Sequence, residues 1–161
     1  MMPMLEIKKY PLPSLKVKAK KVSGVTVDEK RILDDMAETM YLNQGVGLAA
    51  TQVGIDRQFA VIDVGEGLIK LVNPTITSKK GSAQMEEGCL SIPGIQVKIR
   101  RARDVSVSAL NESGEPVNFN ASGLFARAIQ HEVDHLTGKL IIDYLNPLRR
   151  FLLKKKAAKK I

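Results

Sequence analysis

The stretch Gln130-His131-Glu132-Val133-Asp134-His135-Leu136 contains the only two histidines of the 161-residue chain, and it predicts a metal-binding helix. Residues four positions apart on a helix share a face, so the imidazoles of His131 and His135 can converge on one metal ion. Glu132 lies about a quarter-turn away, where its carboxylate can reach a metal-bound water. Because all of the histidine lies in one H-E-x-x-H pattern, a metal site is favoured over two surface histidines on an amphipathic helix.

The two histidines do not complete a catalytic site, since such centres usually have three protein ligands plus water. The long metalloprotease pattern H-E-x-x-H-x-x-G-x-x-H matches through Gly138 but has Ile141 in place of its third histidine. Asp143 is the only acidic residue after His135, and it follows the helix among apolar neighbours. We therefore expect the third ligand to lie upstream.

Cys89, the only cysteine, is the best upstream candidate, in the segment Glu86-Glu87-Gly88-Cys89-Leu90-Ser91. Gly88 would allow close approach of the backbone to a metal or ligand. A bound metal deprotonates a coordinating thiol, which gives the side chain a role that burial alone would not. Taken alone, the segment fits a buried structural cysteine equally well, and the missing third ligand favours the metal.

The rest of the chain alternates helices with short strands, which indicates an α+β domain rather than a βαβ array. Residues 1–25 are expected to be irregular, and Thr26-Val-Asp-Glu29 has the form of a capping box before a helix over residues 28–42. The helix of the histidines is predicted to have Ser122 as its N-cap and to end at Gly138, and a C-terminal helix should open at Asn146-Pro147. The predicted strands are residues 59–64, 69–73, 74–78, 96–99, 105–110 and 116–119.

Composition limits the kind of protein. The length allows one core, no run of about 18 apolar residues predicts a membrane span, and the N-terminus lacks the features of a secretory signal. We expect a cytoplasmic protein. The net charge is +8, and seven basic residues follow Asp143 with no acidic one among them: Arg149, Arg150, Lys154, Lys155, Lys156, Lys159 and Lys160. This indicates a basic tail on a more balanced body, not a nucleic-acid-binding core.

Three segments together resemble the signature motifs of peptide deformylases. They are GVGLAATQ (45–52), EGCLS (87–91) and QHEVDHL (130–136), and they occur in the order found in that family. Taken alone, the first motif would fit a helix C-cap at Gly45 followed by a tight connection. The resemblance implies a compact single α+β domain of short antiparallel strands around a central metal-binding helix. Its catalytic part would span residues 1–147, and residues 148–161 would form a basic helical tail.

The resemblance also implies an activity, the removal of the N-formyl group from the N-terminal methionine of nascent polypeptides. Cys89, His131 and His135 would bind one divalent ion, with Fe(II) expected first and Zn, Ni or Co as substitutes. Glu132 would transfer protons, while the Gln52 amide and the Leu90 backbone N–H would stabilise the oxyanion. Residues in or beside the substrate pocket would be Val46, Gly47, Met85, Glu87, Leu124, Arg127 and Ala128, of which Glu87 is expected to support the metal ligands.

Two positions depart from the pattern of the family. Gln96 stands where the family often has an arginine near the substrate backbone, and Arg127 stands where an apolar pocket residue is expected. We expect the stem of Arg127 to line the pocket wall and its head to reach the rim, where it could meet the second or third residue of the peptide. In the alternative, Arg127 turns away and pairs with a surface carboxylate.

Two other functions compete with this interpretation. The chain could be a different metallohydrolase, such as a peptidase, although the absent third histidine and the EGCLS motif argue against that. It could also be a ribosome- or RNA-binding module whose basic tail is the active part. In that tail, a helix would turn Leu148, Leu152 and Leu153 toward the body and its lysines toward solvent. The resemblance allows ribosome contact through this helix, and we expect neither a membrane nor a specific DNA partner.

Overall fold

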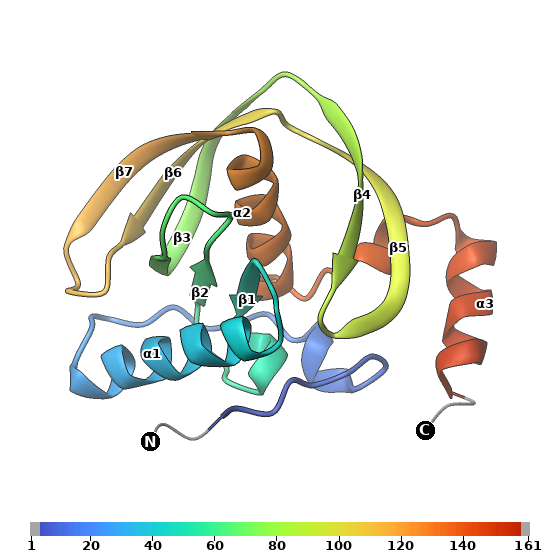
Figure 1. Cartoon of the computed structure of the whole chain (residues 1–161), viewed down its shortest axis with the longest axis horizontal. Coiled ribbons are helices and arrows are strands. Elements are labelled where there is room, and N and C mark those ends of the chain that lie inside the picture. Colours follow the sequence, from blue (N-terminus) through green and yellow to red (C-terminus); the bar gives the residue numbers. More distant parts are fainter. Residues whose placement is uncertain (1–3, 159–161) are drawn as a thin grey trace.

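In the computed structural model, residues 4–158 are described, and they form an α+β domain with one helix at its centre (Figure 1). The helices are α1 (Val27–Leu42), α2 (Gly123–Leu136) and α3 (Pro147–Ala158), with short 3-10 turns η1 (Pro13–Lys16), η2 (Ala50–Val53) and η3 (Ile141–Tyr144). The strands are β1 (Gly47–Ala49), β2 (Phe59–Ile62), β3 (Ile69–Lys80), β4 (Ala83–Cys89), β5 (Ile92–Arg101), β6 (Asp104–Leu110) and β7 (Pro116–Ser122). The predicted fold class is confirmed.

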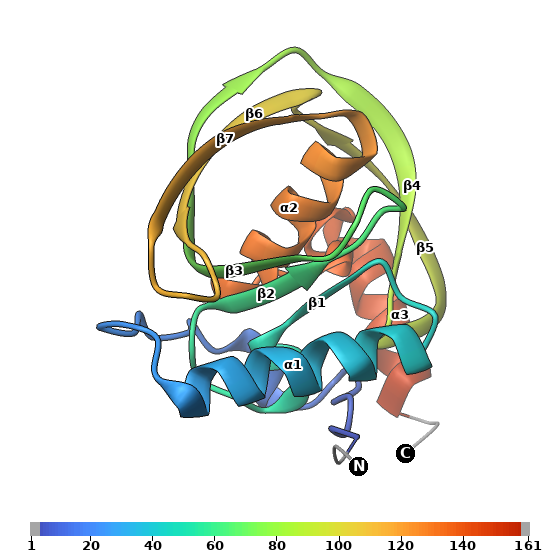
Figure 2. The same cartoon turned by 60° about the vertical axis from the view of Figure 1, so that its left-hand side comes forward.

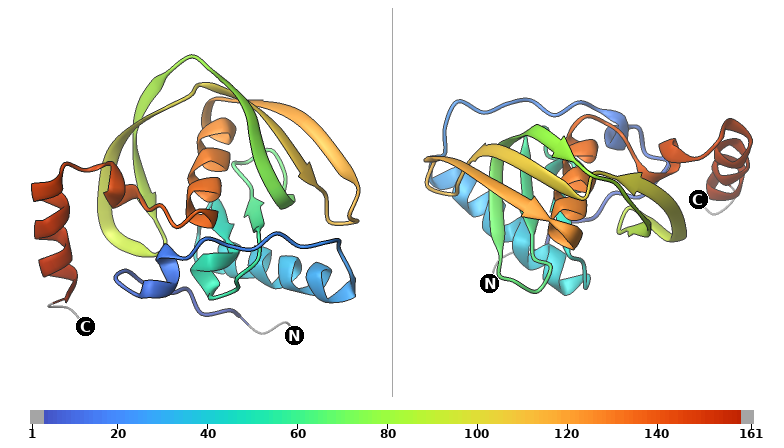
Figure 3. Two further views of the ribbon diagram at one scale, coloured as in Figure 1. Left: turned by 180° about the vertical axis from the view of Figure 1, so that it is seen from behind. Right: turned by 90° about the horizontal axis from the view of Figure 1, so that it is seen from above.

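Two antiparallel sheets flank α2. Strands β1, β2, β3, β6 and β7 make a five-stranded sheet in that order, and β4 pairs with β5 in a separate two-stranded sheet. Figure 1 shows α2 between the larger sheet and the β4–β5 hairpin, and Figure 2 shows α1 running beneath β1 and β2. Seen from behind and from above, α3 stands at the outer edge of the molecule, beyond β5 (Figure 3). The central helix therefore has one sheet on either side.

The strands predicted at residues 69–73 and 74–78 form one continuous strand, β3. The boundary between the two predicted strands falls before Pro74, which cannot donate a ladder hydrogen bond. The chain continues through an irregularity between Val72 and Thr75, where Asn73 has a positive φ of 51°. The Asn73 side chain accepts a hydrogen bond from the Val22 N–H (3.0 Å) and donates one to the Val22 carbonyl (2.8 Å), which fastens the irregular N-terminal segment to the sheet.

Strand β4 was not predicted, and the predicted strand at 96–99 was too short. The sequence of β4, AQMEEGC, is mostly exposed and Glu87 is its one buried residue, so it lacks the apolar alternation that marks a half-buried strand. The strand exists because it pairs with β5 from Ala83 opposite Arg101 to Glu87 opposite Val97. This pairing brings Glu87 and Cys89 alongside α2.

The apolar side chains of α2 are buried against the larger sheet. Ala126 and Ile129 are fully buried in a cluster with Ile62, Leu71 and Val107. Burying a side chain as large as that of Ile129 stabilises a fold by about 1.5–3 kcal/mol, so this contact holds the helix firmly in place. A second cluster packs α1 against β1 and β2, and a third joins β5, η3 and the N-terminal segment. The opposite face of α2 is left to the polar site.

The C-terminal helix begins as predicted, because the Asn146 side chain accepts a hydrogen bond from the backbone N–H of Arg149 (2.9 Å). The expected orientation of its leucines is partly wrong. Leu153 packs against the third cluster, but Leu148 and Leu152 are 68% and 56% exposed. The helix stands at the edge of the molecule, where only one side meets the body (Figure 3). Lys159 and Lys160 of the predicted tail lie outside the described residues. Within residues 4–158, no helix is long and apolar enough to cross a bilayer.

Candidate active site

The three predicted metal ligands come together at the end of β4 and on one face of α2. The Cys89 Sγ lies 3.2 Å from the Nε2 of His135, which lies 3.2 Å from the Nε2 of His131. All three donor atoms are within 4.8 Å of one another. One sulfur and two imidazole nitrogens at this separation suit a late divalent transition metal. Ile141 is buried in η3, and Asp143 binds Lys16 and the Leu140 N–H instead.

The ring of His131 is oriented toward a metal ion, and the imidazole of His135 is in the protonation state that a metal ligand needs. The Nδ1 of His131 lies 2.9 Å from the Glu87 carboxylate, which leaves Nε2 to face the cluster. Burial and the neighbouring His131 lower the pKa of His135 well below its ordinary range, so its imidazole is neutral at neutral pH. The neutral imidazole is the form that binds a metal. The donor atoms of Cys89, His131 and His135 are therefore of a kind that can bind a metal ion.

Glu87 is a buried carboxylate behind His131. Arg101 donates to both of its oxygens, at 2.5 and 2.9 Å, and Arg127 donates to one at 2.6 Å. Burial raises the pKa of Glu87, but the hydrogen bonds and charges of His131 and Arg101 outweigh burial and lower it to about 2. Glu87 is therefore ionised at neutral pH and accepts the Nδ1 proton of His131.

Glu132 lies beside the cluster with a free oxygen. The residue is buried, and its Oε1 has no hydrogen-bond partner among residues 4–158. Burial raises the pKa of Glu132 to about 7, although the charges of His131 and Arg101 oppose the shift. The Glu132 carboxylate occupies the space where a Cβ on Gly47 would point. A carboxylate with a pKa near neutrality and an open oxygen suits proton transfer.

Gln52 reaches the same cluster from η2. Its Oε1 accepts a hydrogen bond from the Ala49 N–H (2.9 Å), which orients the amide. Its Nε2 donates to the Ser91 hydroxyl (3.2 Å) and lies 3.6 Å from the Cys89 sulfur. The Leu90 carbonyl accepts a hydrogen bond from the Lys9 side chain (2.9 Å), which holds the turn after β4 in place. Both Gln52 and Leu90 border the cavity in front of the cluster.

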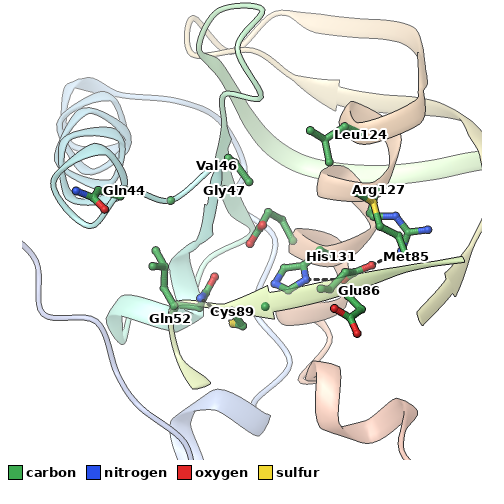
Figure 4. Close-up of a pocket in the computed structure, with 15 residues that line it drawn as sticks. Gln44, Val46, Gly47, Gln52, Met85, Glu86, Cys89, Leu124, Arg127 and His131 are labelled. Carbon is green, nitrogen blue, oxygen red and sulfur yellow. Dashed lines mark hydrogen bonds and ion pairs between the residues drawn. The ribbon is translucent and has the colours of Figure 1, made fainter. Parts of the chain in front are cut away.

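A cavity of about 380 Å³ opens in front of the cluster (Figure 4). Its apolar lining includes Val46, Met85 and Leu124, each about half exposed. Two residues considered for this region are elsewhere. Ala128 is buried in the core between α2 and the larger sheet and is not part of the lining, because its helical position turns it away from the opening. Gln96 is exposed beside α3, where it lines a different groove.

Arg127 borders the cavity as expected, but the expected position of its guanidinium is wrong in both alternatives. Its guanidinium neither reaches the rim nor pairs with a surface carboxylate, since the residue is only 6% exposed and is bonded to the buried Glu87. It also donates to the carbonyls of Ile99 (3.1 Å) and Ala83 (2.8 Å). Figure 4 shows Arg127 and Leu124 projecting from α2 at the upper end of the site. An internal carboxylate and two carbonyls satisfy the charge, which is why burial is tolerated.

The sequence did not single out Arg101, the second arginine on Glu87. It also donates to Asp134 (2.9 Å) and to the Tyr144 hydroxyl (3.1 Å). A signal was available, because Val97, Ile99 and Arg101 alternate as the inward residues of β5. That alternation could be read only if the strand was known to extend to residue 101.

Known proteins share both sequence and fold with this chain. The family model for polypeptide deformylase matches residues 4–151. A peptide deformylase of Thermodesulfovibrio yellowstonii is 46% identical over 160 residues, which cover 96% of this chain and 97% of the relative. One of Halothermothrix orenii is 50% identical over 144 residues, which cover 88% and 94%.

Solved structures agree with these relatives. The crystal structure of the Ehrlichia chaffeensis peptide deformylase in complex with actinonin has a TM-score of 0.95 at 35% identity, covering 99% of this chain and 98% of that one. The Legionella pneumophila enzyme has a TM-score of 0.91 at 39% identity, covering 98% and 95%. The chain belongs to the polypeptide deformylase family, the metal-dependent hydrolases that remove the N-formyl group from the N-terminal methionine of new polypeptides.

Proposed function

We propose that Cys89, His131 and His135 hold one divalent metal ion in this chain and that the formyl group of an N-terminal formylmethionine is hydrolysed beside it. The observation that carries the proposal is the convergence of these three donor atoms within 4.8 Å. Fe(II) is the ion expected first, with Zn, Ni or Co as substitutes, because thiolate and imidazole ligands accept all four. When bound, such an ion acidifies water and polarises a carbonyl.

Glu132 is assigned proton transfer. It accepts a proton from the attacking water and delivers it to the leaving amine, so that formate and a free N-terminal methionine are the products. The free Oε1 and a pKa of about 7 support this role, because the group can both take and give a proton near neutral pH. The carboxylate does not lie among the three converging donor atoms, so we do not assign it to the metal.

Gln52 and Leu90 are assigned to the oxyanion that develops on the formyl carbon. The Gln52 Nε2 lies 3.6 Å from the Cys89 sulfur, so it can donate to an oxygen in front of the cluster. The Leu90 backbone N–H lies on the turn directly after Cys89 and is the second donor. Because the Gln52 amide is fixed by Ala49, it needs little reorganisation as charge develops.

The cavity is assigned to the methionine side chain of the substrate. Val46, Met85 and Leu124 offer apolar walls, and thioether and aliphatic surfaces suit each other. Gly47 borders the same cavity and would let the substrate backbone approach β1 closely.

The tail is assigned a separate role. Residues 1–147 form the catalytic part, and the basic helix from residue 148 onward contacts ribosomal RNA or protein while the chain works in the cytoplasm. Its exposed lysines and its exposed Leu148 and Leu152 support a surface that meets a partner. Contacts between lysine side chains and phosphate groups speed the association with RNA and weaken as the salt concentration rises.

The assay that tests the proposed function measures formate release from formyl-Met peptides, with cleavage of unformylated peptides run beside it. Wild-type protein should release formate and should not cut internal bonds. Glu132→Gln should keep its metal and lose about 10²–10⁴-fold in rate. Cys89→Ala should lose metal and activity together. Internal cleavage without formate release would favour a peptidase, and full metal content in Cys89→Ala would remove that residue from the ligand set.

Anaerobic purification followed by metal analysis tests the identity of the ion. A thiolate beside a redox-active metal in an open site is exposed to oxidation. The iron-loaded protein should therefore lose activity in air faster than a nickel- or zinc-loaded sample. Equal half-lives would count against iron as the working metal.

A further inference from the structure

The buried carboxylate of Glu87 accepts four hydrogen bonds from three side chains. Its Oε2 accepts from Arg101 Nε (2.5 Å) and Arg127 Nη1 (2.6 Å). Its Oε1 is bonded to Arg101 Nη2 (2.9 Å) and His131 Nδ1 (2.9 Å). A carboxylate held at four points cannot rotate, so the direction in which Oε1 faces His131 is set by its other partners.

The two arginines hold Glu87 from different parts of the fold. Arg101 lies on β5 and is itself anchored by Asp134 and the Tyr144 hydroxyl. Arg127 lies on α2, four residues before His131, so both residues face the same way. Glu87, from β4, is therefore held between two side chains of the helix that carries both histidines.

Arg127 also fixes this helix against the β4–β5 hairpin. Beyond its bond to Glu87, Nη1 donates to the Ile99 carbonyl of β5 (3.1 Å) and Nη2 to the Ala83 carbonyl of β4 (2.8 Å). The cluster is balanced in charge, with two arginines facing Glu87 and Asp134. Removing Arg127 would leave Arg101 as the one arginine facing both carboxylates and would free one side of Glu87.

We propose that Arg127 is a positioning residue for the metal site: it orients Glu87 so that Oε1 accepts the Nδ1 proton of His131, and its charge does not bind substrate. This inference rests on the proposed metal site. A hydrogen bond to Nδ1 fixes the tautomer and orientation of a ligating imidazole and raises its basicity. Arg127 acts one step further out, through Glu87. Arg127 borders the cavity, and Met at this position keeps an unbranched side chain while removing the guanidinium.

The experiment measures zinc affinity by competition with a chelator, in the full-length protein. Partners directly behind a metal ligand typically contribute about 10–100-fold to metal affinity, and we expect Glu87→Gln to lose that much. Arg127→Met should lose less, about three- to tenfold, because Arg101 still holds Glu87. Arg127→Lys should recover part of the loss, since an ammonium can make one of the three bonds. Arg100→Met is the matched control, because Arg100 is an exposed arginine of β5 that bonds Ser82 and not Glu87.

A double variant separates positioning from general stability. If Arg127 acts through Glu87, Arg127→Met should weaken zinc binding no further in a Glu87→Gln background. Should Glu87→Gln fail to fold, the visible spectrum of cobalt-loaded Arg127→Met replaces it, because changed ligand orientation shifts the bands and a merely less stable fold does not. The ratio of rates on formyl-Met peptides with acidic and basic third residues should be equal in wild type and Arg127→Met.

The opposing outcomes are distinct. Unchanged zinc affinity and cobalt spectrum in Arg127→Met would overturn the positioning role while leaving the metal site intact. A further loss in the double variant, equal to that of the single one, would also overturn it, because Arg127 would then act independently of Glu87. Wild-type protein that bound no zinc or cobalt would overturn the metal site and this inference together.

Discussion

A side chain at Gly47 would overlap the Glu132 carboxylate, so that carboxylate would have to shift. The Gly47 backbone and the carboxylate share one narrow space at the edge of the cavity. The overlap concerns Glu132 and does not involve the three proposed metal ligands. The absence of a Cβ at residue 47 therefore leaves room for the carboxylate of Glu132, the proposed general base.

Gly47→Ala should displace the Glu132 carboxylate and lower the rate of formate release, by about 10²-fold if the shift approaches 1 Å. Metal content should stay that of wild type, since Cys89 and the two histidines keep their places. Gly24→Ala is the control, because nothing lies within 4 Å of its added carbon. Wild-type activity in Gly47→Ala would show that Glu132 adjusts without cost or has no role in the reaction.

At the scale of one element, α2 is fixed at its C-terminal end. Ser122 occupies the N-cap position, but its side chain makes no capping hydrogen bond. After Leu136 the chain turns at Gly138, which has a φ of 82°. The Leu136 carbonyl accepts a hydrogen bond from the Ala19 N–H (2.8 Å), so the N-terminal segment lies against this end. A Cβ on Gly138 would overlap the Lys16 backbone of that segment.

Gly138→Ala should destabilise the protein for two reasons. The left-handed backbone costs a residue with a side chain about 1–2 kcal/mol, and the overlap with Lys16 adds about 1–3 kcal/mol. Gly114→Ala provides the comparison, since Gly114 has a similar φ of 81° and only an ordinary contact of 3.5 Å with Val25. Urea unfolding should show a larger loss of unfolding free energy for Gly138→Ala than for Gly114→Ala. Equal losses would mean that the N-terminal segment moves aside freely.

At the scale of the whole molecule, Asp143 joins distant parts of the chain. It binds the Lys16 ammonium (2.5 Å) and the Leu140 N–H (2.8 Å), and Arg150 of α3 lies 3.9 Å away. Burial raises the pKa of Asp143, but the Leu140 hydrogen bond and the Lys16 partner outweigh it, so the pKa is lowered below its ordinary value.

The lowered pKa of Asp143 predicts the pH dependence of stability. The folded state favours the charged form, so the stabilisation is complete above the unfolded pKa of about 3.9 and is lost as the pH falls through the lower folded value. Asp143→Asn should lose about 1–3 kcal/mol of unfolding free energy at pH 7. Urea unfolding should give the same difference in unfolding free energy between wild type and Asp143→Asn at pH 7 and pH 5. This difference should shrink below pH 4. A difference that persists undiminished at pH 3 would contradict this assignment.

The tail belongs to the same scale, because its proposed partner is outside the molecule. Replacing Lys154, Lys155 and Lys156 with Gln removes exposed charges and keeps the packing of Leu153. The variant should unfold at the wild-type temperature and release formate from short peptides at the wild-type rate. Its affinity for ribosomes should fall and depend less steeply on salt, by a slope of roughly 0.7–0.9 for each lost contact. An unchanged slope would exclude these lysines from the contact.

Local patterns in the sequence were sufficient to predict the helices and the part of the site that lies on α2. The capping box before α1 is present, because Glu29 accepts a hydrogen bond from the Thr26 N–H (2.8 Å). The spacing of His131 and His135 placed both rings on one face of α2. Each of these features depends on residues within a turn of one another, and helical periodicity acts over that range whatever the rest of the chain does.

Tertiary structure alone decided which distant residues meet. Strand β4 could not be predicted from its sequence, which has no apolar alternation, since pairing with β5 creates it. The burial of Arg127 could not be predicted either, because its partner Glu87 is 40 residues away and reaches α2 only when the hairpin folds beside the helix. A buried charge is stable only where the fold supplies an opposite charge and hydrogen bonds. The sequence alone thus indicated Cys89, His131, His135 and Glu132, and the folded chain determined which distant side chains surround them and hold them in place.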